Sequence, residues 1–155
     1  MNAEIKLQAA SRSDSDYQCW LDQTVAQLRE KDFSHLDLDN LIEEIEGLGR
    51  SEKREISSDL MRLCEHLLKI KYWEFERADY FRIWDREIVN FRLQIQEQLA
   101  ISLSLSPCLK DNSQKQYQNG RKLFIKASHL DASLISKEPE FTLEQALDEA
   151  LLDLR

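Results

Sequence analysis

The residues with the clearest chemical potential lie in Leu36–Ile56, where acids, glycines and arginines are crowded together. On a helix through this stretch, Glu43, Glu46 and Arg50 would share a face, because residues three and four apart are neighbours. Arg54 would follow one turn later. Glu46 and Arg50 would then form an ion pair on the helix surface. The alternative is that the two arginines bind an anion or the carboxylates of a partner.

Two glycines interrupt the stretch, and each costs about 1 kcal/mol relative to alanine inside a helix. We therefore predict a joint at residues 47–51, either a kink or a true break. Gly49 suits the left-handed position just past a helix end, and Ser51 suits the next N-cap.

His66 and Lys69 fall on one flank of the helix expected after this joint. We interpret His66 as a partly buried, hydrogen-bonded residue in preference to a catalytic base. The predicted interaction or binding face comprises Glu43, Glu46, Arg50, Arg54, His66 and Lys69.

Most other kinds of functional site are disfavoured, because the residues that they need do not occur at the required spacing. The "GLGR" at Gly47 lacks the third glycine and the preceding strand of a dinucleotide-binding loop. None of the three histidines has a Glu three residues before it, as a di-metal carboxylate bundle requires. Cys64 and His66 have no local pair of further zinc ligands. We expect no metal and no cofactor.

The net charge of −8 argues against nucleic acid as a partner, because phosphate binding depends on clustered Lys and Arg. The aromatic and basic stretch 69–92 is accordingly interpreted as a packed helical hairpin. No run reaches the roughly 18 apolar residues of a membrane span. The three cysteines form no C-x-x-C pair, as expected of reduced thiols in a cytoplasmic protein.

The sequence contains few Gly and Pro residues and no strand-like alternation of apolar and polar residues, which favours an all-α fold. We predict a single-domain bundle of five to six helices over residues 1–155, with a flexible N-terminus to about residue 14. We expect helices at about 16–31, 38–48, 51–73, 79–103 and 107–128, the last capped by Ser106. Thr142 and Gln145 predict a capping box near the C-terminus.

Apolar residues recur at helical spacing in each of these segments. Tyr17, Leu21, Val25 and Leu28 form the first stripe, and Leu41, Ile45 and Leu48 form the second. Gly120 is expected to allow close approach of a neighbouring helix. The predicted core anchors are Trp20, Leu63, Leu67, Trp84 and Phe91.

Several segments together resemble a known bacterial family, domain of unknown function family twenty-nine. They are "DYQCWLDQTVAQLRE" from Asp16, "LDLDNLIEEIEGLGRSEKRE" from Leu36, "HLLKIKY" from His66, Trp84 with the "REI" that follows, "SPCLK" from Ser106 and "FTLEQALDE" from Phe141. The resemblance implies an all-helical cytoplasmic bacterial protein and no established activity. Ile83 and Glu87 stand where the family usually has serine and threonine.

The leading hypothesis is a non-enzymatic helical module, an adaptor or subunit that presents the predicted face to a protein partner or to a second copy. The alternative is a small-ligand-binding protein or enzyme with a polar pocket between helices. That pocket would use His66 as acid or base and Arg50 or Arg54 to hold an anion.

Overall fold

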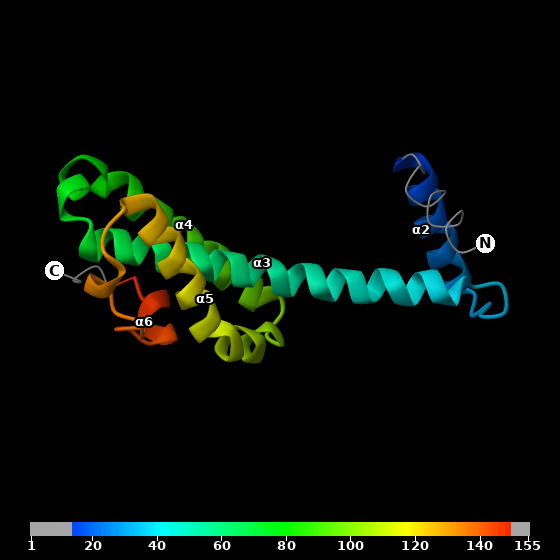
Figure 1. The fold of residues 1–155 in the computed structure, drawn as a ribbon. Helices are drawn as coiled ribbons and strands as arrows, with labels where there is room; N and C mark the ends of the chain where they lie inside the picture. The colour runs from blue at the N-terminus through cyan, green and yellow to red at the C-terminus, as the bar shows by residue number, and fades with distance from the viewer. Residues whose placement is uncertain (1–13, 150–155) are drawn as a thin grey trace. The chain divides into compact units, whose positions relative to one another are not determined.

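The computed structural model describes residues 14–149, and these form α-helices, one 3-10 helix and no strand. The α-helices are α2 (Asp14–Arg29), α3 (Leu38–Tyr72), α4 (Glu74–Ile101), α5 (Leu105–Ser128) and α6 (Leu143–Leu147), with η1 (Ala132–Leu134) before the last (Figure 1). The prediction of an all-α helical bundle is confirmed. The N-terminal segment expected to be flexible lies outside the described residues.

The chain divides into two compact units, Met1–Gly47 and Leu48–Arg155. The first contains α2 and the start of α3, and the second contains the rest of α3 with α4, α5, η1 and α6. A single domain over the whole chain stays a prediction.

Helix α3 runs from Leu38 to Tyr72 without interruption, so a true break at residues 47–51 is wrong, whereas a kink there stays a prediction. No glycine in the described residues has a positive φ, and Ser51 lies inside the helix. The physical reason is a balance of costs. Two glycines cost about 2 kcal/mol in a helix, whereas a break leaves helix-end N–H and C=O groups unpaired and requires a second helix to nucleate.

In the second unit, α4, α5 and α6 gather round the C-terminal half of α3 (Figure 1). Trp73 alone separates α3 from α4, so α4 begins five residues earlier than predicted. The Trp73 ring stacks on Trp84 at 5.6 Å and meets Phe124 edge-on at 6.1 Å. The helical hairpin predicted for residues 69–92 is therefore present, and its aromatic rings help to close the core.

The core of this unit is a continuous cluster of buried apolar side chains from α3, α4, α5 and the C-terminal segment. Its members are Ile56, Leu60, Leu63, Cys64, Leu67, Leu68, Ile70, Trp84, Ile88, Ile95, Leu105, Leu109, Tyr117, Phe124, Ile135 and Ala146. Apolar side chains at helical spacing on each helix account for this cluster.

Helix α5 begins at Leu105 with Ser104 as its N-cap, so the cap predicted at Ser106 is wrong. Pro107 still lies in the first turn, where a missing N–H leaves no internal hydrogen bond unmade. The capping box predicted at Thr142 and Gln145 is confirmed, because each side chain accepts a hydrogen bond from the other residue's backbone N–H.

Arg121 fixes the segment that follows α5. Its guanidinium donates to the carbonyl oxygens of Ala132 at 2.6 Å, Ile135 at 2.9 Å and Ser136 at 3.0 Å. Further along the same segment, Glu140 accepts from Tyr72 at 2.6 Å and pairs with Lys71. These contacts hold residues 132–140 against α3 and α5.

Candidate functional site

The first unit is a helical hairpin, residues 14–47, formed by α2, a turn and the start of α3. Past the end of α2, Lys31 takes the left-handed conformation, and the Asp32 N–H donates to the Gln27 carbonyl at 2.9 Å. His35 Nδ1 lies 2.8 Å from Asp32 Oδ2, and Gln27 donates to the His35 carbonyl at 3.2 Å. Side-chain and backbone contacts therefore define the turn between α2 and α3.

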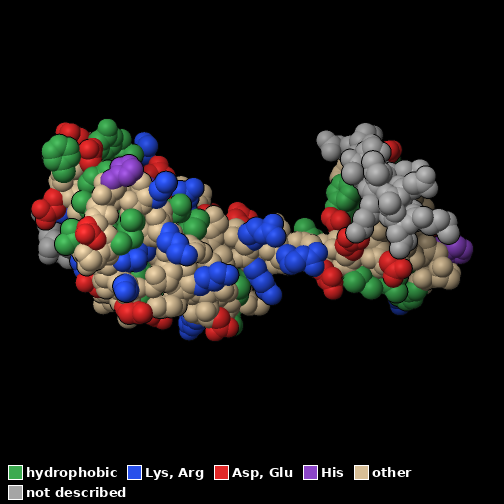
Figure 2. All heavy atoms as spheres, in the orientation of Figure 1, with side chains coloured by type: hydrophobic (Ala, Val, Ile, Leu, Met, Phe, Trp, Pro, Cys, Tyr) green, Lys and Arg blue, Asp and Glu red, His purple; other side chains and the backbone are tan. Residues whose placement is uncertain are grey.

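No apolar side chain between Asp16 and Gly47 is buried. On α3, Leu38 is 56 % exposed, Ile42 47 % and Ile45 59 %. Because they step by four and three residues, they form one stripe along the helix. Tyr17, Val25 and Leu28 of α2 are also exposed. We call these six residues the hairpin stripe. Figure 2 shows hydrophobic and acidic side chains side by side over this unit.

Acidic residues follow the α3 part of the hairpin stripe in register. Asp39, Glu43 and Glu46 each come one residue after a stripe residue, so they form a parallel row about 100° round the helix. All three are exposed, and Glu46 interacts with another residue. The two predicted acidic site residues therefore border an exposed apolar stripe.

The α2 and α3 helices of the hairpin also contact each other through polar groups. Tyr17 donates its hydroxyl hydrogen to the Glu44 carboxylate. This contact raises the pKa of the Tyr17 hydroxyl, chiefly through the hydrogen bond itself. Trp20, predicted as a core anchor, is half-buried here, and its ring stacks on Tyr17 at 6.1 Å.

The basic half of the predicted face lies in the second unit, and its members are not equivalent. Arg50 and Arg54 are exposed, and Arg50 interacts with another residue. Lys69 lies 3.3 Å from the buried carboxylate of Glu65. His66 comes 12 residues after Arg54, which places it about a third of a turn round the helix from Arg54. The structure therefore does not bring Arg54 and His66 together.

His66 matches the interpretation of a partly buried, hydrogen-bonded residue. Its Nδ1 lies 2.8 Å from the Arg62 carbonyl oxygen, and its ring packs against Phe91 at 5.4 Å. Burial lowers the pKa of the imidazole, although the contact with the Arg62 carbonyl opposes this shift. Lys69 also lowers it, whereas Glu65 and Glu87 raise it.

The other predicted core anchors lie in the second unit. Leu63, Leu67 and Trp84 are buried, and Phe91 is partly buried against the same cluster. Arg92 was not predicted as a buried residue. It is 1 % exposed and donates from Nε to the Ala146 carbonyl at 2.8 Å. Burial lowers the pKa of its guanidinium. A lone arginine in an amphipathic helix carries no signal of such a contact 54 residues away.

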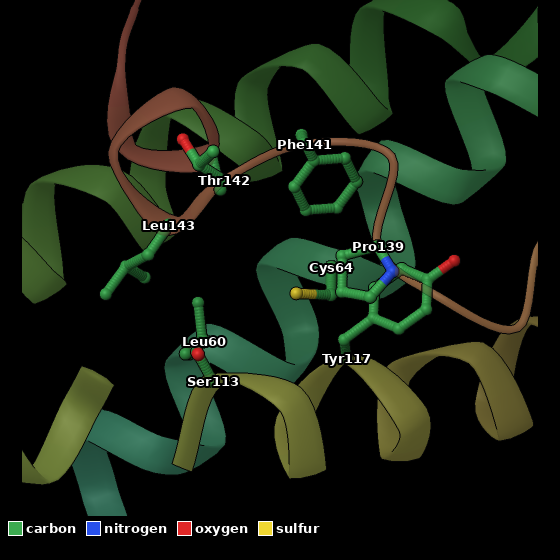
Figure 3. Close-up of a pocket in the computed structure, with 9 residues that line it drawn as sticks. Leu60, Cys64, Ser113, Tyr117, Pro139, Phe141, Thr142 and Leu143 are labelled. Carbon is green, nitrogen blue, oxygen red and sulfur yellow. The ribbon is translucent and has the colours of Figure 1, made fainter. Parts of the chain in front are cut away.

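A cavity of about 40 Å³ lies between α3, α5 and the C-terminal segment (Figure 3). Its lining residues are Leu60, Cys64, Ser113, Tyr117, Pro139, Phe141, Thr142, Leu143 and Ala146. Such a volume accommodates about one water molecule. Burial raises the pKa of the Cys64 thiol to about 12, which keeps it protonated and unreactive at neutral pH.

This cavity does not provide the pocket of the alternative hypothesis, because His66, Arg50 and Arg54 are all absent from its lining.

Within residues 14–149, no three His, Cys, Asp or Glu side chains lie close enough to hold a metal ion. In the same part of the chain, no helix is both long and apolar enough to span a membrane.

The sequence model of the family described as Domain of unknown function DUF29 matches residues 13–152. No curated protein and no solved structure matches the chain. Because the family match covers nearly the whole sequence, the chain belongs to this family.

Proposed function

We propose that this member of the DUF29 family is a non-enzymatic protein-interaction module, an adaptor or subunit that binds another protein through its acidic helical hairpin. The observation that carries the proposal is that the hairpin exposes the hairpin stripe and buries no apolar side chain. The second unit, in contrast, surrounds a continuous core.

The two helices of the hairpin leave apolar side chains of both helices uncovered. An amphipathic helix normally buries a stripe at least 100° wide, and isolated helices of this length are only marginally stable in water. An exposed apolar surface with a polar rim is typical of a protein-binding site. A partner that covered the hairpin stripe would supply the missing part of a small helical core.

The proposal places this interaction in a bacterial cytoplasm, as the family resemblance implies. All three cysteines are free thiols, including the exposed Cys19, as is usual in a reducing compartment. The ligand-binding or enzymatic alternative has less support, because the cavity is small and is lined by other residues than those it requires.

A tagged pull-down from the native cells, followed by mass spectrometry, tests the proposal. Three baits are compared: the wild-type chain, Ile42→Ser on the hairpin and Ile83→Ser on α4. The two isoleucines are matched, since Ile42 is 47 % exposed and Ile83 is 48 % exposed.

The expected result is a stoichiometric protein partner that wild type and Ile83→Ser retain and that Ile42→Ser loses. Retention of the same partner by Ile42→Ser would refute the hairpin as the binding surface. Recovery of the chain alone with a bound small molecule would refute the adaptor function and favour the ligand-binding alternative.

A further inference from the structure

The charge of the chain is concentrated in the hairpin. Residues 14–47 carry ten acids and two bases, which leaves nineteen of each in the rest of the sequence. The hairpin therefore accounts for the whole net charge of −8. A surface with this excess attracts positive partners and raises their association rate.

The hairpin presents helices and no free backbone edge. The N–H and C=O groups of α2 and α3 are largely used within their own helices, so an extended segment could not add to the surface as a strand. A helix satisfies its own backbone hydrogen bonds and can lay an apolar stripe against the hairpin stripe.

From these two observations we infer that the partner segment is a basic amphipathic helix of another protein. Its apolar side chains cover Leu38, Ile42 and Ile45, and its Lys or Arg side chains lie along Asp39 and Glu43. The α3 part of the hairpin, residues 38–47, is about three turns long, so the docked segment is of about the same length. This inference rests on the proposed function and specifies its partner.

A second copy of the chain fits the same surface poorly. Two hairpins face to face would bring together ten acids from each, and like charges across an interface disfavour association. Nucleic acid and anionic lipid are disfavoured for the same reason, because both present phosphates. The basic helix removes the repulsion and covers the apolar stripe at once.

The test uses the full-length chain and three synthetic peptides of roughly four helical turns. The first carries leucines at i, i+3, i+4 and i+7 with lysines on both flanks. The second has glutamate in place of each lysine, and the third has the first peptide's composition in an order without helical periodicity. Binding is measured by fluorescence anisotropy at low and high salt, with wild type, Ile42→Ser and the matched control Ile83→Ser.

We expect only the lysine-flanked amphipathic peptide to bind, with affinity that falls as salt screens the charges. Ile42→Ser should weaken it about tenfold, since one buried isoleucine contributes on that scale, and Ile83→Ser should not change it. No binding of this peptide, or equal binding of the glutamate or non-periodic peptide, would overturn the inference.

The same variants separate this inference from the proposed function. If the pull-down yields a partner lost by Ile42→Ser while no lysine-flanked peptide binds, the hairpin binds protein but the partner chemistry is wrong. Sedimentation velocity tests the remaining possibility, that a second copy of the chain occupies the surface. A wild-type dimer that Ile42→Ser dissociates would show that a second copy covers the stripe, and would also overturn the inference.

Discussion

Gly120 of α5 lies so close to Met61 of α3 that a Cβ atom built on it would be 2.7 Å from the Met61 carbonyl oxygen. The same atom would be 3.0 Å from Cys64 Cβ and from the Glu65 backbone nitrogen. Two of these three neighbours are backbone atoms of a core helix and cannot rotate away. The two helices are therefore in backbone contact at this glycine.

Replacement of Gly120 by alanine should lower the free energy of unfolding by about 1–3 kcal/mol, the usual cost of overpacking a core. The matched control is Gly49→Ala, because a Cβ at Gly49 has no atom within 4 Å. That control should stabilise by about 0.5–1 kcal/mol through helix propensity. Urea unfolding of both variants measures the difference, and equal effects would contradict the close contact.

Removal of the Arg121 guanidinium should loosen the segment after α5. Arg121→Met keeps much of the aliphatic stem but leaves three carbonyl oxygens without their charged donor. We expect a loss of about 2 kcal/mol in unfolding free energy, since the partly exposed carbonyls can recover bonds to water. Lys122→Met, at the exposed neighbouring position, should change stability little. Hydrogen exchange should locate the effect of Arg121→Met at residues 132–136.

Acid should destabilise the chain partly through His66. Burial lowers the pKa of the folded imidazole from its usual 6.5, so the unfolded state binds more protons as the pH falls. The contribution of His66 to the free energy of unfolding is therefore fully present above pH 6.5 and declines as the pH falls below that value. His66→Phe, which cannot titrate, should lose less stability than wild type between neutral and mildly acidic pH. Urea unfolding at both pH values checks this, and parallel losses would contradict it.

Charge reversal at Glu43 should weaken the partner complex mainly by slowing association. The change places a positive charge beside Ile42, where a basic partner helix would lie. We expect Glu43→Lys to reduce the association rate several-fold in stopped-flow or surface-plasmon measurements. Glu52→Lys, an identical change at an exposed position of the second unit, should have a smaller effect. Equal effects would indicate that only net charge matters.

Arg54→Glu tests the basic half of the predicted face separately. Arg54 is exposed, whereas His66 is partly buried and Lys69 pairs with Glu65. If Arg54 contacts the partner, its reversal should weaken the complex at both low and high salt. If binding involves the hairpin alone, Arg54→Glu should leave the complex unchanged or slightly stronger, because it removes a positive charge that repels a basic helix.

Local spacing predicted much of the fold. Leu63 and Leu67 are buried as the stripe of their helix predicted, and Gly120 makes the expected close approach. The continuity of α3 was not predicted. The cost of two glycines in a helix can be read directly from the sequence, whereas the cost of the N–H and C=O groups left unpaired at a helix break cannot.

The site was less predictable, for two physical reasons. The helical spacing of Leu38, Ile42 and Ile45 is the same whether an apolar stripe enters a core or a partner, so periodicity alone could not separate the two. The uneven distribution of charge around this apolar stripe was the sequence feature that could have indicated a partner. The contacts of Arg92 and Arg121 depend on chain segments brought together by folding, which no local pattern encodes.

Cys19 provides a natural position for labelling the hairpin, because it is far more exposed than Cys64. Cys19 is exposed on α2, whereas the Cys64 thiol is buried and stays protonated, and Cys108 is only partly exposed. A maleimide fluorophore or spin label should therefore react first at Cys19. Its emission or mobility would then report partner docking on the hairpin in the natural sequence, without an engineered cysteine.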